Sequence, residues 1–152
     1  MNAAARADTA DVDDEPDYVR LAEFRKALRA FLRWSEEQVR DVGLTTMQHQ
    51  LLLAVKGLPE GTRPTVTALA HRLCLKHHST VELINRLEQR GAVVRHHSDQ
   101  DRREVLIELT PHGEEILERL SVLHWQEVQS LAPALSNALE TIVNHHNLLR
   151  SA

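Results

Sequence analysis

Seven lysine and arginine residues gather between His71 and Arg103, a stretch that also contains five of the ten histidines. Four acidic residues oppose them, which leaves this stretch with a formal charge of about +3. Ammonium and guanidinium groups donate charge-assisted hydrogen bonds to phosphate oxygens. The chemistry that this pattern favours is binding to a phosphate backbone, by Arg72, Lys76, Arg86, Arg90, Arg95, Arg102 and Arg103.

The overall formal charge of −4 does not exclude that chemistry, because the charge is unevenly distributed. Residues 1–19 alone carry −5, so the remaining chain is close to +1. Affinity for nucleic acid depends on the charge of the contacting face and not on the global sum.

The first four of these cations, Arg72 to Arg90, fall in or next to two predicted helices. Thr65 can cap a helix over 65–73, which has apolar residues on one face at Val66, Leu69, Ala70 and Leu73. A tight break at Cys74–Leu75 precedes a second helix that runs to Arg90 and is followed by a glycine. Helices joined by so short a turn cross at a large angle, which predicts a helix-turn-helix.

Two β-branched runs follow, over 92–95 and 105–109, and the polar loop HHSDQDRRE joins them. This pattern predicts a hairpin with a charged tip. The preceding loop GLPEGTRP has room for a short extended segment that pairs with this hairpin. A helix-turn-helix followed by a basic-tipped hairpin is a winged helix, a shape that binds DNA.

The rest of the chain is expected to be helical, so the predicted fold class is mainly α with a small β-hairpin wing. Helices are predicted over 17–42, 45–56, 111–131 and from Pro133 to about 149. The expected domains are a disordered acidic tail (1–16), an N-terminal dimerisation helix (17–43), a winged helix-turn-helix DNA-binding lobe (44–110) and C-terminal dimerisation helices (111–152).

The terminal helices have more apolar surface than the central lobe can cover. Their stripes include Leu21, Leu28 and Leu32 near one end and Leu135, Leu139 and Ile142 near the other. Exposing this surface would cost about 25 cal/mol per Å². A two-fold homodimer would bury it, and would present two recognition helices to DNA about 34 Å apart.

Several classes of function are not expected. No catalytic triad spacing, paired catalytic carboxylates or phosphate-binding glycine loop is present, so an enzyme and a bound cofactor are not predicted. The chain has no apolar run that would span a membrane, its N-terminal segment is acidic, and it has one cysteine. These features favour a cytoplasmic protein without a membrane partner.

Between Leu69 and Leu117 the sequence resembles the MarR family of bacterial transcription regulators. The resemblance rests on LAHRLCLKHHSTVELINRLEQRGAV and on SDQDRREVLIELTPHGEEIL, and most of all on the pattern DxDRR-x-V-x-I-x-L-T-x-x-G from Asp99 to Gly113. Gln100 stands where the family often has proline. The resemblance extends over about 17–149. It implies a homodimer that binds a palindromic double-stranded DNA operator, usually as a repressor that a small aromatic ligand or oxidation releases.

The resemblance also assigns roles to individual residues. It places the N-terminal residues of the second helix in the major groove, namely Lys76, His77, His78, Ser79 and Thr80. Asp101 and Arg103 match the family's Asp-x-Arg pair of the wing, in which the carboxylate would hold the guanidinium for the minor groove. Further phosphate contacts are expected from Arg86, Arg95 and Arg102.

The family's usual ligand site lies between the dimerisation helices and the DNA-binding lobe, where Phe31, Trp34 and His49 are the candidates. Each of the three is equally compatible with a core position. Cys74 is interpreted as a small apolar filler of the turn, with a redox role left open.

The predicted function is therefore a homodimeric, sequence-specific DNA-binding transcription regulator, most often a repressor. Two alternatives remain open. The pairs His77–His78, His96–His97 and His145–His146 raise the possibility of a zinc-sensing regulator on the same fold, although adjacent residues of a helix or strand point to different sides and chelate poorly. The second alternative is a winged-helix module that binds proteins without binding DNA.

Overall fold

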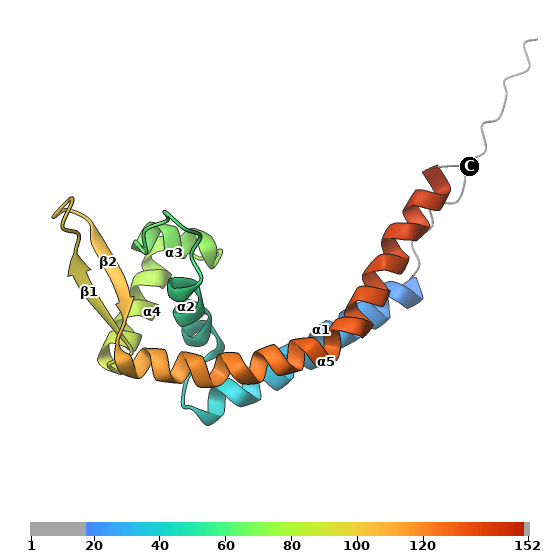
Figure 1. The fold of residues 1–152 in the computed structure, drawn as a ribbon, viewed down its shortest axis with the longest axis horizontal. Helices are drawn as coiled ribbons and strands as arrows, with labels where there is room; N and C mark the ends of the chain where they lie inside the picture. Colours follow the sequence, from blue (N-terminus) through green and yellow to red (C-terminus); the bar gives the residue numbers. More distant parts are fainter. Residues whose placement is uncertain (1–17, 151–152) are drawn as a thin grey trace, which may run out of the picture. The chain divides into compact units, whose positions relative to one another are not determined.

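The structure is a computed structural model that describes residues 18–150, except for the side chains at 141, 142 and 144–150. The predicted acidic tail and the side chains of His145 and His146 lie outside the described residues. The elements follow in the order α1 (Tyr18–Asp41), α2 (Thr46–Lys56), α3 (Val66–Arg72), α4 (His77–Gln89), β1 (Val93–His97), β2 (Val105–Leu109) and α5 (Pro111–Arg150) (Figure 1). The predicted fold class, mainly α with a β-hairpin wing, is confirmed.

The chain divides into two compact units, of which residues 32–127 form one. This unit contains α2, α3, α4 and the hairpin, together with the last part of α1 and the first part of α5. It is larger than the predicted lobe of 44–110, because Val39 of α1 and Leu117 and Leu120 of α5 are buried in the same hydrophobic core as the helix-turn-helix.

Threonine side chains define where two helices of this unit begin. Thr45 caps α2 through a capping box, in which its hydroxyl accepts the Gln48 N–H at 3.3 Å and the Gln48 side chain accepts the Thr45 N–H at 2.9 Å. Thr65 caps α3 by accepting the N–H of Ala68 at 3.1 Å. Lys76 stands at the corresponding position of α4 and forms no side-chain cap. Each threonine cap contributes about 1 kcal/mol.

The wing is an antiparallel pair of β1 and β2, with Val93 opposite Leu109 and His97 opposite Val105. The first strand extends two residues beyond the predicted end, because the backbones of His96 and His97 pair across to β2 instead of belonging to the loop. The predicted third segment is confirmed. Thr65 forms a bridge with Leu106, and the N–H of Ile107 donates to the carbonyl of Pro64 at 2.9 Å.

Helix α5 is continuous from Pro111 to Arg150 and contains Pro133, so the predicted break into two C-terminal helices is wrong. A proline inside a helix costs about 3 kcal/mol because it removes one backbone hydrogen bond and crowds the preceding turn. The neighbours of Pro133 are Leu131, Ala132, Ala134 and Leu135, which are strong helix formers and offset that local cost.

A glycine allows α5 to approach the hairpin closely. A Cβ atom at Gly113 would lie 1.9 Å from the carbonyl oxygen of Ala92, and Thr110 donates its N–H to the same oxygen at 3.1 Å. The close approach holds the first turns of α5 against the base of the wing. None of the helices in the described part of the chain is both long and apolar enough to cross a membrane.

Candidate nucleic-acid interface

The first turn of α4 exposes polar and potentially cationic side chains. Lys76, His77 and His78 are exposed and Ser79 is half-buried. Further along the same helix Arg86 is exposed and, among the described residues, has no ion pair. Four of the five residues predicted to enter the major groove are therefore accessible from solvent.

Thr80 is the exception, and its assignment to the DNA contacts is corrected by the structure. Its side chain is 0% exposed, and its hydroxyl donates to the carbonyl of Lys76 at 3.1 Å. Since this side chain faces the core, Thr80 supports the start of the helix from inside. Sequence position alone did not distinguish it from its exposed neighbours.

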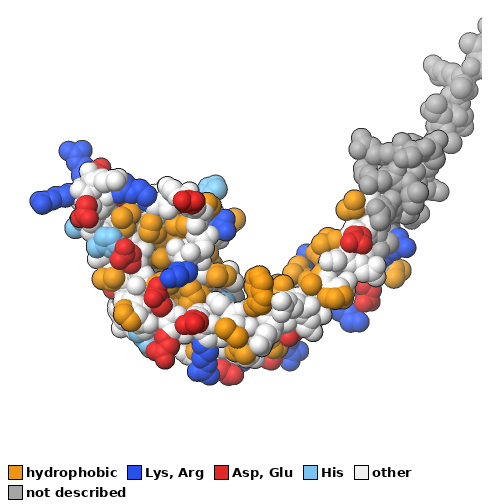
Figure 2. Space-filling view, in the orientation of Figure 1, with side chains coloured by type: hydrophobic (Ala, Val, Ile, Leu, Met, Phe, Trp, Pro, Cys, Tyr) orange, Lys and Arg blue, Asp and Glu red, His pale blue; other side chains and the backbone are white. Residues whose placement is uncertain are grey.

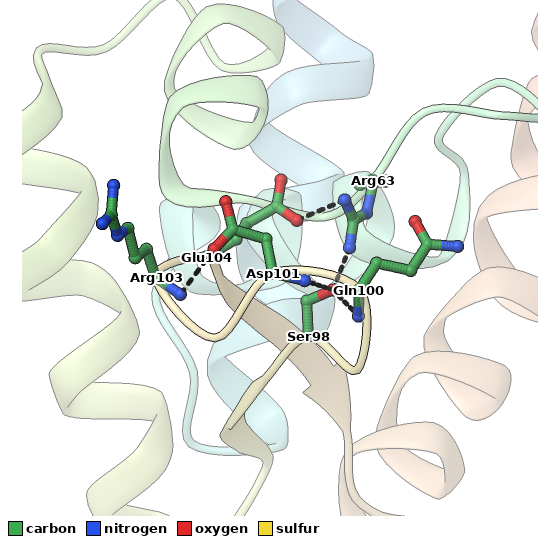
Figure 3. Close-up of polar contacts among 6 residues, drawn as sticks. All are labelled: Arg63, Ser98, Gln100, Asp101, Arg103 and Glu104. Atoms are coloured by element: carbon green, nitrogen blue, oxygen red, sulfur yellow. Dashed lines mark hydrogen bonds and ion pairs between the residues drawn. The ribbon is translucent and has the colours of Figure 1, made fainter.

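A polar network fixes the loop between the two strands of the wing (Figure 3). The hydroxyl oxygen of Ser98, a residue only 3% exposed, accepts the backbone N–H groups of Gln100 at 3.1 Å and Asp101 at 3.4 Å. Arg63 donates to the same hydroxyl and pairs with Glu104 at 2.5 Å. Arg63 belongs to the segment before α3, so the wing loop is bound to the helix-turn-helix by side chains as well as by backbone pairing.

Sequence reasoning missed Arg63, Ser98 and Glu104 as residues that hold the interface in shape. Two signals for them were present. The GLPEGTRP loop was predicted to pair with the hairpin, and a serine shortly before an aspartate is typical of a side-chain-stabilised turn. The pairing partner of Arg63 depends on the tertiary arrangement, which no local pattern supplies.

Asp101 shapes the tip of the wing through the backbone. Its carboxylate accepts the backbone N–H of Arg103 at 2.9 Å, and the Arg103 guanidinium points away from it (Figure 3). The prediction that the Asp101 carboxylate contacts the Arg103 guanidinium is therefore wrong, because the carboxylate contacts the backbone of Arg103 instead. The short aspartate side chain satisfies a nearby N–H in the turn, which leaves the guanidinium exposed.

Arg102 and Arg103 are exposed and, in the part of the chain that the structure describes, neither forms an ion pair. Basic side chains accordingly project from the tip of the wing (Figure 2). Arginines free of intramolecular carboxylates keep all their N–H donors for phosphate oxygens or for a narrow minor groove.

Arg95 differs from these two arginines. It lies on β1, pairs with Glu88 of α4 and donates to the Asn85 side chain at 2.7 Å. Its guanidinium thus joins the wing to α4. The two acceptors on α4 lie within reach of the strand and give Arg95 this structural role, while its predicted phosphate contact stays a prediction.

The arrangement agrees with comparisons to known proteins. A family model described as the MarR family matches residues 42–104. A transcriptional regulatory protein for the hcr operon of Thauera aromatica, described as putative, is 27% identical over 114 residues, which are 75% of this chain and 67% of that protein. Over this segment the chain is similar to the MarR family. These matches support a transcription regulator rather than an enzyme.

Solved MarR-like structures show the same fold at low identity. The S. aureus MepR–DNA complex is 21% identical, with a TM-score of 0.64 over 91% of this chain and 100% of that one. Bordetella bronchiseptica BpsR, whose structure concerns regulation of DNA binding by 6-hydroxynicotinic acid, is 23% identical, with a TM-score of 0.60 over 81% and 94% of the two chains. At these identities the likeness establishes the winged-helix fold alone.

Two of the three predicted ligand contacts, Trp34 and His49, lie in one aromatic cluster. The rings of His49 and His124 are 4.8 Å apart, and the Trp34 ring meets His124 edge-on at 5.1 Å. Phe31 belongs to the other compact unit. His124 was not anticipated, because only the packing of α5 against α1 and α2 brings it to this cluster.

Hydrogen bonds fix the ring of His124. Its Nδ1 donates to the carbonyl of Leu120 at 2.7 Å, since a carbonyl only accepts. In the neutral ring Nε2 then accepts the hydroxyl proton of the buried Ser35 at 2.6 Å. His49 is 2% exposed, and its Nδ1 is buried without a hydrogen-bond partner. Burial lowers the pKa of His49 to about 4, and the neighbouring His124 contributes further to the lowering.

Cys74 is exposed and adopts a left-handed backbone conformation, with φ of 54°. The interpretation of Cys74 as an apolar filler is therefore wrong, because the left-handed residue that ends α3 lies on the outside of the turn. For the alternative of a metal sensor, the described residues contain no group of three or more histidine, cysteine or acidic side chains arranged to hold a metal ion.

Proposed function

We propose that this chain is a member of the MarR family, a homodimeric, sequence-specific DNA-binding transcription regulator, and that it acts as a repressor released by a small aromatic ligand. The observation that carries the proposal is that two sets of potential DNA contacts are exposed on the same compact unit, residues 32–127. One set is the exposed first turn of α4 and the other is the wing tip with Arg102 and Arg103.

Each set suits a different part of the duplex. The first turn of α4 enters the major groove, where Lys76, His77, His78 and Ser79 reach base edges and phosphates. The arginines of the wing enter the adjacent minor groove, in which a narrow width concentrates negative potential. Arg86, further along α4, contacts phosphate. A solved complex of DNA with MepR, which has a similar fold, supports DNA binding by this chain.

Dimerisation is supported by the apolar side chains that a single chain leaves in solvent. On α1 the side chains of Tyr18, Val19 and Leu21 are exposed, and α5 exposes Val128, Leu139 and Val143. All six belong to the compact unit formed by 18–31 and 128–150. A second copy buries these faces and places two α4 helices on one DNA face, which favours a palindromic operator.

Release by a ligand is supported by BpsR, whose DNA binding is regulated by 6-hydroxynicotinic acid. A ligand that binds the DNA-free form better than the DNA-bound form shifts the protein off its operator. An aromatic effector suits the cavity lined by Val42, Leu44, Ile116 and Arg119, which combines apolar and cationic side chains.

The test begins with selection of bound sequences from a random duplex pool. Affinity for the selected duplex is then measured against salt concentration for the parent, Arg103→Ala and the control Arg33→Ala. Arg33 is an exposed arginine of α1 that pairs with Glu37 and lies outside the proposed interface. We expect Arg103→Ala to lose about 1–3 kcal/mol of binding free energy and about one unit of salt slope, with Arg33→Ala unchanged.

A selection that returns no enriched sequence, with binding that is weak at every salt concentration, would contradict the proposal and favour the protein-interaction alternative. If Arg103→Ala binds like the parent at every salt concentration, the wing tip makes no contact and the DNA assignment rests on α4 alone.

A further inference from the structure

The first half of α1 exposes a row of cations on one side of the helix. Arg25, Lys26 and Arg29 are exposed, and they are neighbours because residues three or four apart share one side of a helix. The half-buried Phe24 and Phe31 lie on the other side. We call Arg25, Lys26 and Arg29 the basic stripe. All three belong to the compact unit formed by 18–31 and 128–150.

The basic stripe lacks the acidic neighbours that the second half of α1 provides. There two arginines each pair with a glutamate four residues away, at 3.4 and 3.2 Å, in Arg33–Glu37 and Arg40–Glu36. Arg29 instead has arginines four residues away on both sides and a lysine three residues away. Within the described residues Arg25 and Arg29 form no hydrogen bond or ion pair, and Lys26 has Glu23 alone, at 3.6 Å. Like charges at this spacing destabilise a helix, so an anion on the stripe would stabilise it.

The chain that precedes α1 carries the complementary charge. Residues 1–17 contain six acids, at 8, 11, 13, 14, 15 and 17, against the single cation Arg6. Every one of these acids lies within ten residues of Tyr18. A chain extends by up to about 3.4 Å per residue, so the most distant acid can reach about 34 Å from Tyr18. Arg29 lies only about 17 Å along the helix from Tyr18, at about 1.5 Å per residue.

We propose that the acidic segment 8–17 docks on the basic stripe of its own chain and screens it from other polyanions, nucleic acid included. The inference goes beyond the proposed function, because the proposed DNA contacts on α4 and the wing do not include the stripe. Exposed charges separated by more than about 10 Å interact weakly at 0.1 M salt. The direct connection of segment 8–17 to α1 overcomes this limit by keeping its carboxylates at a high local concentration.

The consequence concerns specificity. An uncovered basic stripe attracts any polyanion, without regard to sequence. With the stripe covered by segment 8–17, binding to nucleic acid depends on the exposed residues of α4 and the wing. The segment would therefore lower non-specific binding while leaving the proposed specific contacts in place.

The chain has three lysines, and their positions allow a direct test of where segment 8–17 lies. A water-soluble carbodiimide joins a lysine amine to a carboxylate in contact with it, and mass spectrometry of the peptides identifies the pair. Lys26 belongs to the basic stripe and Lys76 to the start of α4. Lys56 contacts Glu114 at 2.6 Å, so a link between these two side chains shows that the reagent has worked.

We expect a link from Lys26 to segment 8–17 in a product of monomer mass. Its yield should fall at least about threefold between about 0.05 and about 0.5 M salt, because salt screens exposed ion pairs. The matched control is a neutral-tail variant of the full chain, in which the link should disappear. This variant carries Asp8→Asn, Asp11→Asn, Asp13→Asn, Asp14→Asn and Glu15→Gln.

Three outcomes of the cross-linking would overturn the inference. The first is a Lys56–Glu114 link without a Lys26 link to segment 8–17. The second is a link from the segment to Lys76 instead of Lys26, which would place the segment on the proposed DNA contacts. The third is a Lys26 link found only in a product of dimer mass, which would place the segment on a second copy of the chain.

The second measurement is the salt concentration that elutes the chain from heparin, a sulfated polyanion. The neutral-tail variant should elute at least about 0.1 M later than the parent, because its basic stripe is uncovered. Adding Arg25→Gln and Arg29→Gln should remove this shift. Adding Arg33→Gln and Arg40→Gln removes the same charge from paired positions of α1 and should keep most of it.

Equal elution of the parent and the neutral-tail variant would overturn the screening role, as would an equal loss of the shift in both double substitutions. Neither measurement requires an operator. A chain that binds no duplex would therefore contradict the proposed function, while the docking of segment 8–17 is decided by the Lys26 link and the heparin elution alone.

Discussion

Replacing His49 by phenylalanine should make the chain more resistant to acid. His49 is 2% exposed, and burial lowers its pKa to about 4, whereas the unfolded chain binds the same proton near pH 6.5. Between these two values the unfolded state carries a proton that the folded state lacks. The contribution of His49 to stability is therefore present above about pH 6.5 and is lost as the pH falls.

The magnitude follows from the two pKa values. Between pH 7 and pH 5 the proton that His49 binds only when unfolded destabilises the parent by about 2 kcal/mol. Phenylalanine keeps a ring against His124 and removes the Nδ1 atom that has no hydrogen-bond partner. We therefore expect His49→Phe to be close to the parent at pH 7 and about 2 kcal/mol more stable relative to it at pH 5.

Urea unfolding followed by circular dichroism at pH 7, 6 and 5 measures this difference, at one fixed protein concentration because a dimer unfolds in a concentration-dependent manner. The control is His71→Phe, since His71 is exposed on α3 and should leave the pH dependence of the parent intact. Parallel stability curves for the parent and His49→Phe, within about 0.5 kcal/mol, would refute the reasoning. His49 would then be protonated in the folded state as easily as in the unfolded one.

Three further changes test the frame that holds the proposed interface. Gly113→Ala should lower the free energy of unfolding by at least about 2 kcal/mol in urea, because its Cβ would lie 1.9 Å from the Ala92 carbonyl oxygen. The control is Glu118→Ala, an exposed position of the same helix, which should leave stability close to that of the parent. Arg63→Ala removes the contacts of the wing loop with Ser98 and Glu104, so it should lower duplex affinity without lowering the salt slope. An unchanged affinity would show that these contacts are not needed to hold the wing in place. Asp101→Ala should weaken duplex binding less than Arg103→Ala does, because it removes a backbone contact and leaves the guanidinium; an equal or larger loss would indicate that Asp101 has another role.

The elements of the winged helix could be predicted from the sequence because their determinants are local. Thr65 and its neighbours specify the start of α3, and the hairpin strands follow from their β-branched residues. The interruption at Pro133 was also predicted from a local rule, and that prediction was wrong. The proline raises the free energy of the helix by only a few kcal/mol, and the helix-forming residues on both sides of Pro133 outweigh this cost.

The residues that hold the candidate site in shape could not be predicted in the same way. Ser98 and Arg63 are distant in sequence, as are His49 and His124, and each contact exists only because several elements pack in one arrangement. The same limit applies to Arg95 and Arg103, which look alike as basic residues of the hairpin. Acceptors on α4 occupy Arg95, while the turn geometry of Asp101 leaves Arg103 exposed. Charge in a sequence thus indicates which surface can meet DNA, and the internal partners of each cation decide which side chains remain available to do so.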